Sequence, residues 1–246
     1  AVAAQQKNAP LPNIIPEPVE MTSGQGQFTI SRATRVYAAD KEAEKSAKYF
    51  IDYFNRHFGY RLALAKKDAG EDLIVFSDRK NGETSGGYTL TVTPEAIRIE
   101  GNDGPGVFYG MQSLIQMLPT RAGVLPIIGA VTIRDYPRFA YRGMHFDCVR
   151  HFFPVEYVKR YIDYLALHKM NYFHWHLTDD QAWRLEMKSH PELTAQGSTR
   201  EGEILGLYPG TYRKRPYGGY YTQEQAKEIV EYAAERYITV IPEIDI

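Results

Sequence analysis

The 246 residues carry 29 Lys and Arg against 30 Asp and Glu, which leaves a formal net charge of −1 at pH 7. This balance disfavours a nucleic-acid-binding protein, because such a protein typically gathers an excess of basic residues on one face. No apolar run approaches the roughly 18 residues of a membrane-spanning helix. The single cysteine, Cys148, excludes an intrachain disulfide.

The chain is expected to begin with a tail at residues 1–12, which show no regular apolar period. Residues Ala1–Gln5 would suit the end of a signal-peptide cleavage region, and a cloning remnant or a disordered terminus fits them equally. Together with the substrate argument below, they lead us to expect an exported protein. Residues 13–135 then alternate short strand patterns with two helical patterns. Strands are expected at residues 28–30, 35–38, 73–77, 88–93 and 96–100.

The two helical patterns of this first half have clear boundaries. Asp40 is a favourable N-cap for a helix that runs to about His57. A second helix is expected to begin at Asp103, followed by a proline that suits the first turn, and to end at Pro119. Residues 13–135 therefore predict a small α+β domain, with both helices on one face of a largely antiparallel sheet.

The pattern changes after Asp135. Strands are expected at residues 142–147, 170–177 and 238–244, and helices at 154–168 and 222–236, the last opened by a capping box of Thr222 and Gln225. Apolar strands that alternate with helices pair in parallel. Residues 136–246 therefore predict the start of a (β/α)8 TIM barrel that is truncated after about three βα units. The loop of about forty residues before the last helix is long enough to indicate a functional role.

Polar residues gather where each of the three barrel strands ends. These clusters are Asp147–His151, His174–Asp180 and Glu243–Asp245. Active sites of such barrels lie at the carboxyl ends of the strands. The sequence therefore predicts a site at this end of the sheet.

Two chemistries fit these clusters. His174 and His176 could share a metal ion with Asp179 or Asp245, although short His-x-His runs also occur as hydrogen-bonded core residues. The second interpretation, which we favour, groups the carboxylates around Arg150, whose guanidinium can bind two neighbouring sugar hydroxyls. N-caps and structural salt bridges in loops are the alternative, which we favour for Asp180 but not for Asp179 or Arg150.

Several motifs of the second half occur in an order that resembles glycoside hydrolase family 20, the β-N-acetylhexosaminidases. The motifs are Tyr136–Phe139, Arg142–Pro154, His174–Arg184, Pro191–Leu193, Gly218–Thr222 and Ile241–Asp245. The first half resembles, in its pattern of elements, the small domain that precedes the barrel in this family. The resemblance implies a glycan substrate with a terminal N-acetylhexosamine and no metal or cofactor.

The resemblance also implies roles for individual residues. Arg150 matches the arginine that binds hydroxyls of the non-reducing-end sugar, and Asp179 matches an aspartate that braces it. Asp245 matches a second bracing aspartate, and His176 would support the others from behind. Arg142 is expected to pack at the floor of the barrel.

The reaction of the family is substrate-assisted: the 2-acetamido oxygen attacks C1, and a neighbouring Asp-Glu pair orients the acetamide and transfers protons. No such pair occurs in this sequence, and we expect it beyond Ile246. The chain is therefore expected to need the remainder of the barrel and to be inactive alone. A non-catalytic glycan-binding protein is the alternative, and a metal-dependent barrel hydrolase comes third. Glycans of this kind lie mainly outside the bacterial cytoplasm or in lysosome-like spaces, which also favours export.

Overall fold

The computed structural model describes residues 10–79, 84–121, 123–206 and 210–245. The chain divides into two compact units, Ala1–Ala140 and Tyr141–Ile246, each of which has its own sheet. The first nine residues of the expected tail lie outside the described residues. None of the described helices combines the length and the apolar character needed to cross a bilayer.

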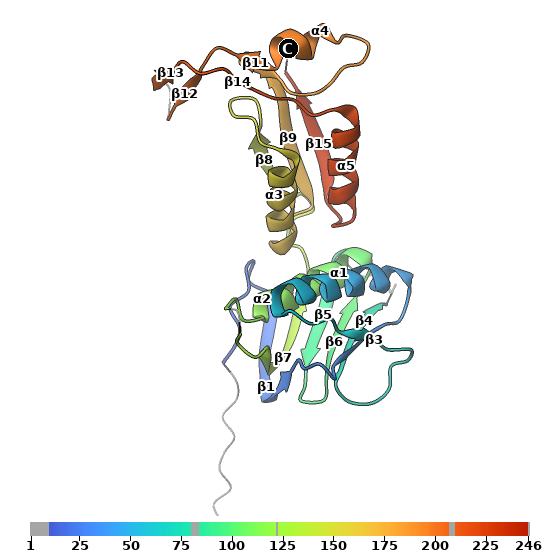
Figure 1. The fold of residues 1–246 in the computed structure, drawn as a ribbon. Coiled ribbons are helices and arrows are strands. Elements are labelled where there is room, and N and C mark those ends of the chain that lie inside the picture. The colour runs from blue at the N-terminus through green and yellow to red at the C-terminus, as the bar shows by residue number, and fades with distance from the viewer. Residues whose placement is uncertain (1–9, 80–83, 122, 207–209, 246) are drawn as a thin grey trace, which may run out of the picture. The chain divides into compact units, whose positions relative to one another are not determined.

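The first unit is a seven-stranded sheet with two helices along one face (Figure 1). The strand order is β1-β7-β5-β6-β4-β2-β3. The elements are β1 Glu20–Thr29, β2 Arg35–Ala38, α1 Lys41–Phe58, β3 Ala63–Leu64, β4 Leu73–Asp78, β5 Tyr88–Val92, β6 Ala96–Gly101, α2 Gly104–Met117 and β7 Ile127–Asp135.

The direction of these strands corrects the expectation of a largely antiparallel sheet. The neighbours from β1 to β6 are antiparallel, but β6, β4, β2 and β3 pair in parallel. Helix α1 lies between β2 and β3 along the chain, and a helical crossover between neighbouring strands makes them parallel. The sheet is therefore mixed. The sequence analysis also missed β3 and β7 and most of β1.

Both helices begin where their caps predicted. The Asp40 side chain accepts a hydrogen bond from the backbone N–H of Ala43 at 2.9 Å, and Gly59, with φ of 74°, ends α1. The Asp103 side chain accepts one from Gly106 at 2.8 Å, with a proline in the first turn of α2. Local hydrogen bonding thus sets the start of each helix.

The second unit contains three parallel strands in the spatial order β8, β9, β15 (Figure 1). They are β8 Gly143–Asp147, β9 Tyr172–Asp179 and β15 Thr239–Ile244, joined through helices α3 Val155–Leu167 and α5 Gln223–Ala234. The predicted capping box of Thr222 and Gln225 opens α5. The described strands form an open sheet and no closed barrel. The carboxyl ends of the three strands lie at the same end of the sheet.

The long segment between β9 and α5 holds several short elements. These are β10 Ala182–Trp183, α4 Glu192–Gly197, β11 Thr199–Arg200, β12 Glu203–Leu205, β13 Thr211–Arg213 and β14 Tyr217–Gly218. Two short antiparallel pairs form within it, β11 with β14 and β12 with β13. Much of the segment is therefore held in regular backbone pairs beyond the carboxyl ends of the strands.

Arg184 ties this segment to the loop after β8. Its side chain is fully buried and donates to the carbonyl oxygens of Cys148 (3.1 Å), Val149 (2.8 Å), Ser198 (2.6 Å) and Gly219 (2.9 Å). The planar guanidinium offers five N–H donors, so one side chain can bind carbonyls from three parts of the chain. The backbone just before Arg150 is fixed in this way.

Candidate functional site

The side chains of Arg150, His176 and Asp179 meet at the carboxyl ends of β8 and β9. Arg150 follows β8, whereas the other two belong to β9. Arg150 Nη1 lies 2.6 Å from Asp179 Oδ2 and 2.8 Å from His176 Nε2. His176 Nε2 also lies 3.0 Å from Asp179 Oδ2. The structure thus brings together three of the four residues that the sequence analysis named for the sugar site.

Asp147, the last residue of β8, fixes the turn that carries Arg150. Asp147 Oδ1 accepts hydrogen bonds from the backbone N–H groups of Val149 (2.8 Å) and Arg150 (3.1 Å). Every side-chain contact recorded for Arg150 within the described residues uses Nη1, and 47% of its side chain is exposed. The Nε and Nη2 donors are therefore available to two adjacent hydroxyls of a ligand.

Asp179 is held in its charged form. The backbone N–H of Asp180 donates to Asp179 Oδ1 at 2.7 Å, and this bond is the main cause that lowers the pKa of Asp179. His176 and Arg150 lower that pKa further, against the opposing effect of burial. A carboxylate with a lowered pKa is a poor proton donor at neutral pH. Asp179 therefore suits charge balance and orientation of Arg150 better than acid catalysis.

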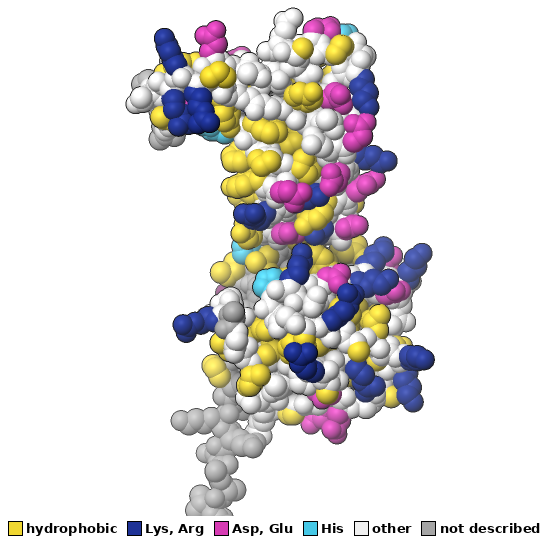
Figure 2. Space-filling model, viewed as in Figure 1, with side chains coloured by type: hydrophobic (Ala, Val, Ile, Leu, Met, Phe, Trp, Pro, Cys, Tyr) yellow, Lys and Arg dark blue, Asp and Glu magenta, His cyan; other side chains and the backbone are white. Residues whose placement is uncertain are grey.

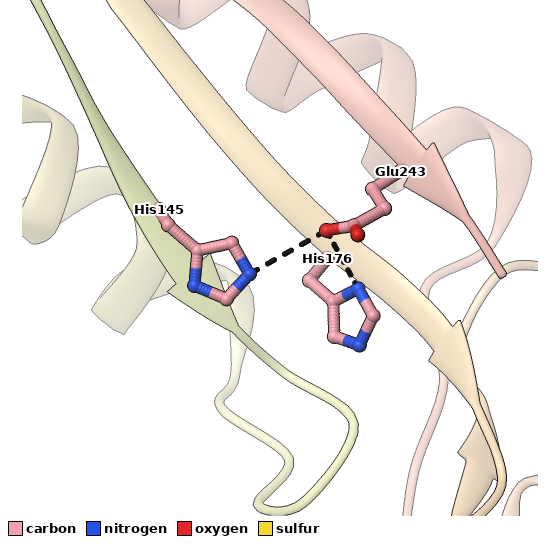
Figure 3. A group of neighbouring side chains, drawn as sticks. All are labelled: His145, His176 and Glu243. Carbon is pink, nitrogen blue, oxygen red and sulfur yellow. Dashed lines mark ion pairs between the residues drawn. The ribbon is translucent and has the colours of Figure 1, made fainter.

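A second cluster adjoins the first and centres on Glu243 of β15. Figure 3 shows the Glu243 carboxylate pointing toward His145 and His176. Glu243 Oε2 lies 2.7 Å from His176 Nδ1, 2.8 Å from His174 Nε2 and 3.4 Å from His145 Nε2. Burial alone would raise the pKa of Glu243, but His176 and His174 outweigh it and lower that pKa. His176 thus stands between two carboxylates.

The sequence analysis gave no role to His145, although a signal for it was present. His145 pairs in register with His174, and both Asp147 and Glu243 pair with His176 on either side of β9. Alternate residues of a strand share one face of the sheet. Aligning the three predicted strands would therefore have placed His145 on the same face as the assigned residues.

The geometry does not favour the metal interpretation. His145, His176 and Glu243 offer ligand atoms that all lie within 4.8 Å of one another. The 2.7 Å from Glu243 Oε2 to His176 Nδ1 is, however, shorter than the roughly 3.3 Å that would separate two ligands about 2.0–2.1 Å from a tetrahedral zinc ion. His174 and His176 face Glu243, and the Asp179 contact is made by the opposite nitrogen of His176. These contacts are better described as direct contacts between histidine rings and carboxylates.

Two further residues named from the sequence, Asp245 and Arg142, make other contacts. Asp245 exchanges two hydrogen bonds of 2.8 Å with the Thr178 hydroxyl through its backbone N–H and carbonyl. The bracing role of its side chain stays a prediction. Arg142 Nε donates to the Lys169 carbonyl at 2.8 Å, just before β8 begins and hence at the opposite end of the strand from Arg150.

Cys148 cannot serve as a ready nucleophile. Its buried Sγ accepts hydrogen bonds from Trp175 Nε1 at 3.1 Å and from the Tyr221 hydroxyl at 3.2 Å. Burial raises the pKa of the Cys148 thiol to about 11. Only the thiolate is reactive, so Cys148 is a structural residue under the strand ends.

A pocket of about 240 Å³ opens beside Arg150. Its other lining residues are His151, Gln181, Arg200, Gly202, Gly206 and Tyr212. Hydrogen-bond donors, an amide and one aromatic ring are side-chain types that suit a sugar. Arg150 therefore borders a concave space that a small polar ligand could enter.

Residues 139–246 match the catalytic domain of glycosyl hydrolase family 20, and residues 11–136 match domain 2 of the same family. The chain belongs to glycosyl hydrolase family 20. Membership agrees with the resemblance found in the sequence motifs. It also explains why two units follow one another in this order.

Named members of family 20 are similar over nearly the whole chain. The β-hexosaminidase of Porphyromonas gingivalis is 39% identical over 242 residues, which is 95% of this chain and 30% of that protein. The β-hexosaminidase of Vibrio furnissii is 36% identical over 95% of this chain and 37% of its own length. The chain therefore spans about a third of the length of these relatives.

Solved structures of family 20 share the fold. A mutant β-hexosaminidase of Streptomyces plicatus in complex with product (GlcNAc) has a TM-score of 0.84 and 36% identity, over 99% of this chain and 48% of that one. The exo-β-N-acetylglucosaminidase of Vibrio harveyi in complex with N-acetylglucosamine has a TM-score of 0.82 and 32% identity, over 100% and 39%.

Proposed function

We propose that the protein to which this chain belongs removes terminal N-acetylglucosamine or N-acetylgalactosamine from β-linked glycans. The observation that carries the proposal is the guanidinium of Arg150, held through Nη1 by Asp179 with Nε and Nη2 left available, in a chain that belongs to family 20. A fork of two N–H donors suits the vicinal hydroxyls of a sugar ring. The family 20 structures named above, which hold N-acetylglucosamine, support the same substrate class.

In this proposal the chain contributes binding rather than bond cleavage. Arg150 binds hydroxyls of the non-reducing-end sugar, and Asp179 neutralises and orients Arg150. The 2-acetamido oxygen of the substrate attacks C1, so the protein needs no nucleophile of its own. The three parallel strands begin a (β/α)8 barrel, and the Asp-Glu pair for acetamide orientation and proton transfer belongs to the rest of it.

The test is hydrolysis of p-nitrophenyl N-acetyl-β-glucosaminide by the full-length protein and by two variants. Arg150→Ala should lower kcat/KM by at least about 100-fold, because it removes two hydrogen bonds from a charged donor. The exposed Arg160→Ala, on α3 and outside the site, is the matched control and should retain full activity. An Arg150→Ala variant as active as the parent would refute the proposed site. Binding of N-acetylglucosamine without hydrolysis by the parent would favour a non-catalytic glycan-binding protein.

Export is proposed with the function, because the glycans in question lie mainly outside the cytoplasm. Fractionation of the source cells, followed by immunodetection, would test it. Detection in the cytoplasmic fraction alone would refute export and leave the proposed chemistry intact.

A further inference from the structure

The two ring nitrogens of His176 face different partners. Nε2 lies 2.8 Å from Arg150 Nη1 and 3.0 Å from Asp179 Oδ2, as described above. Nδ1 lies 2.7 Å from Glu243 Oε2. Only 3% of His176 is exposed, and Figure 3 shows its ring turned so that one nitrogen points at the Glu243 carboxylate. The imidazole therefore links Glu243 to the Arg150–Asp179 pair.

The short contact at Nδ1 decides which nitrogen carries the proton. Nδ1 of His176 and Oε2 of Glu243 are both buried, and neither has a well-aligned hydrogen-bond partner among the described residues, so the two atoms face each other in close contact without an ideal angle. A nitrogen lone pair 2.7 Å from a carboxylate oxygen is repelled by it, whereas an N–H at that position is attracted to it. Nε2 also lies near a carboxylate oxygen, Asp179 Oδ2 at 3.0 Å, but Arg150 Nη1 is closer to both atoms and can only donate, so an N–H on Nε2 would face that donor at 2.8 Å. The proton therefore belongs on Nδ1.

The proton on Nδ1 determines what Nε2 can do. In the neutral ring, Nε2 is then an acceptor, and its neighbour Arg150 Nη1 can only donate. Nη1 carries two hydrogens, one for His176 Nε2 at 2.8 Å and one for Asp179 Oδ2 at 2.6 Å. Both hydrogens of Nη1 are thus directed into the protein, which turns Nε and Nη2 toward the ligand side.

We propose that Glu243 is a positioning residue for Arg150 and acts through His176. Its carboxylate holds His176 as the Nδ1–H tautomer, and the acceptor so created at Nε2 fixes the rotation of the Arg150 guanidinium. A carboxylate that sets the tautomer of an imidazole is a general device for orienting the group on the other side of the ring. The proposal rests on the proposed sugar-binding role of Arg150.

Other charged groups face the same ring system from each strand. His145 and Asp147 lie on β8, His174 on β9, and Asp179 at its end. His174 Nε2 and His145 Nε2 both approach Glu243 Oε2, at 2.8 and 3.4 Å, and the ring of His145 also contacts the ring of His176. Asp147 Oδ2 lies 3.4 Å from Arg150 Nη1. Glu243 is therefore the one carboxylate recorded beside Nδ1 within the described residues.

The first test reads the tautomer directly, by ¹⁵N NMR of the histidine-labelled full-length protein. The parent should show His176 with a protonated Nδ1 and an unprotonated Nε2 near neutral pH. Glu243→Gln should shift His176 toward the Nε2–H form, since an amide no longer favours a proton on Nδ1, and Glu243→Asp should restore the parent tautomer at least in part. Exposed Glu231→Gln, on α5, is the matched control. A parent His176 protonated at Nε2 alone, or a Glu243→Gln tautomer identical to the parent, would overturn the proposal.

The second test measures N-acetylglucosamine binding to the same folded variants, followed by chemical-shift changes. Glu243→Gln should weaken binding about fivefold to tenfold, with Glu243→Asp closer to the parent and Glu231→Gln within twofold. Unchanged binding in Glu243→Gln with a switched tautomer would overturn the positioning role. A parent that shows the Nδ1–H tautomer but binds no sugar would refute the proposed function of Arg150 while leaving the tautomer assignment standing.

Discussion

The two units of the chain bury their polar groups in different ways. In the first unit, the buried Tyr88 hydroxyl contacts Ser113 at 2.6 Å and Asp135 at 3.0 Å, and the surrounding core is aliphatic and aromatic. In the second unit, Arg184 is buried under the strand ends and His176 lies among charged groups. Burial of ionisable groups is costly unless each is paired or hydrogen-bonded.

This difference indicates which unit carries a functional site. The first unit uses its polar residues to close turns and cap helices, as Asp40 and Asp103 do. The second unit places several charged or titratable groups at the carboxyl end of a three-stranded sheet, where they contact one another. Polar residues concentrated at the carboxyl ends of parallel strands are typical of a functional site. Four predictions test this difference between the units.

The largest effect is expected in the apolar core of the first unit. Phe54 is fully buried, and its ring packs against Phe50, Phe58 and Tyr60. Phe54→Ala should destabilise this unit by about 3–5 kcal/mol, because a large cavity replaces the ring. Urea unfolding followed by amide hydrogen exchange in α1 would measure it. Loss of less than about 1 kcal/mol would mean that the core collapses around the gap.

A somewhat smaller effect is expected from Arg184→Met, which keeps a long side chain but removes the donors. Four backbone carbonyls would lose their hydrogen bonds to a charged group, and we expect a loss of about 2–4 kcal/mol. The loops at residues 148–149, 198 and 219 should exchange amide hydrogens faster. Arg160→Met, on the surface of α3, is the control. Unchanged exchange in these loops would show that the other contacts suffice to hold them.

Arg184 also illustrates what the sequence could not predict. The starts of α1, α2 and α5 were predicted correctly because each cap acts on residues a few positions away. The four carbonyls that bind Arg184 come from positions up to 36 residues away, and no local pattern marks them. The mixed direction of the first sheet was missed for the same reason, since it depends on how β4 and β6 meet.

The site was predictable in part. The ends of three strands carried Arg150, Asp179 and Glu243, and the barrel pattern placed those ends at one edge. Which carboxylate meets His176 depends on strand register, because a shift of one residue turns a side chain to the other face. The register places Glu243 opposite His176, a contact for which the sequence gave no local signal, whereas the bracing role of Asp245 stays a prediction.

A moderate effect is expected from the cap of α2. The Asp103 carboxylate accepts hydrogen bonds from the backbone N–H groups of Gly106 and Gly86 and from the Ser85 hydroxyl. Asp103→Ala should cost about 1–2 kcal/mol, toward the upper end for a cap that also holds a neighbouring turn. Thermal unfolding would measure it. Asp103→Asn is the matched variant and should recover most of the loss, because an amide oxygen still caps the helix.

The smallest effect is expected at acid pH, where the contribution of one ion pair from each unit to the free energy of unfolding can be compared. Asp68 binds Arg98 through two contacts of 2.7 and 2.9 Å on the surface of the first unit, and Asp179 binds Arg150 in the second. The pKa of each carboxyl is lowered, Asp68 chiefly by its bond to Arg98 and Asp179 chiefly by the backbone N–H of Asp180. A carboxyl with a lowered folded-state pKa contributes stability above its ordinary pKa and loses it as the pH falls through the lowered value.

Asp68→Asn and Asp179→Asn should therefore both flatten the acid limb of the stability profile, measured by unfolding between about pH 6 and 2. The change should be larger for Asp179→Asn, because Asp68 lies in an exposed pair that solvent and salt screen. Added salt should reduce the Asp68 effect more than the Asp179 effect. Equal salt sensitivity would mean that the Arg150–Asp179 pair behaves as an ordinary surface pair. The contrast between a structural first unit and a charged, preorganised second unit would then rest on Arg184 and His176 alone.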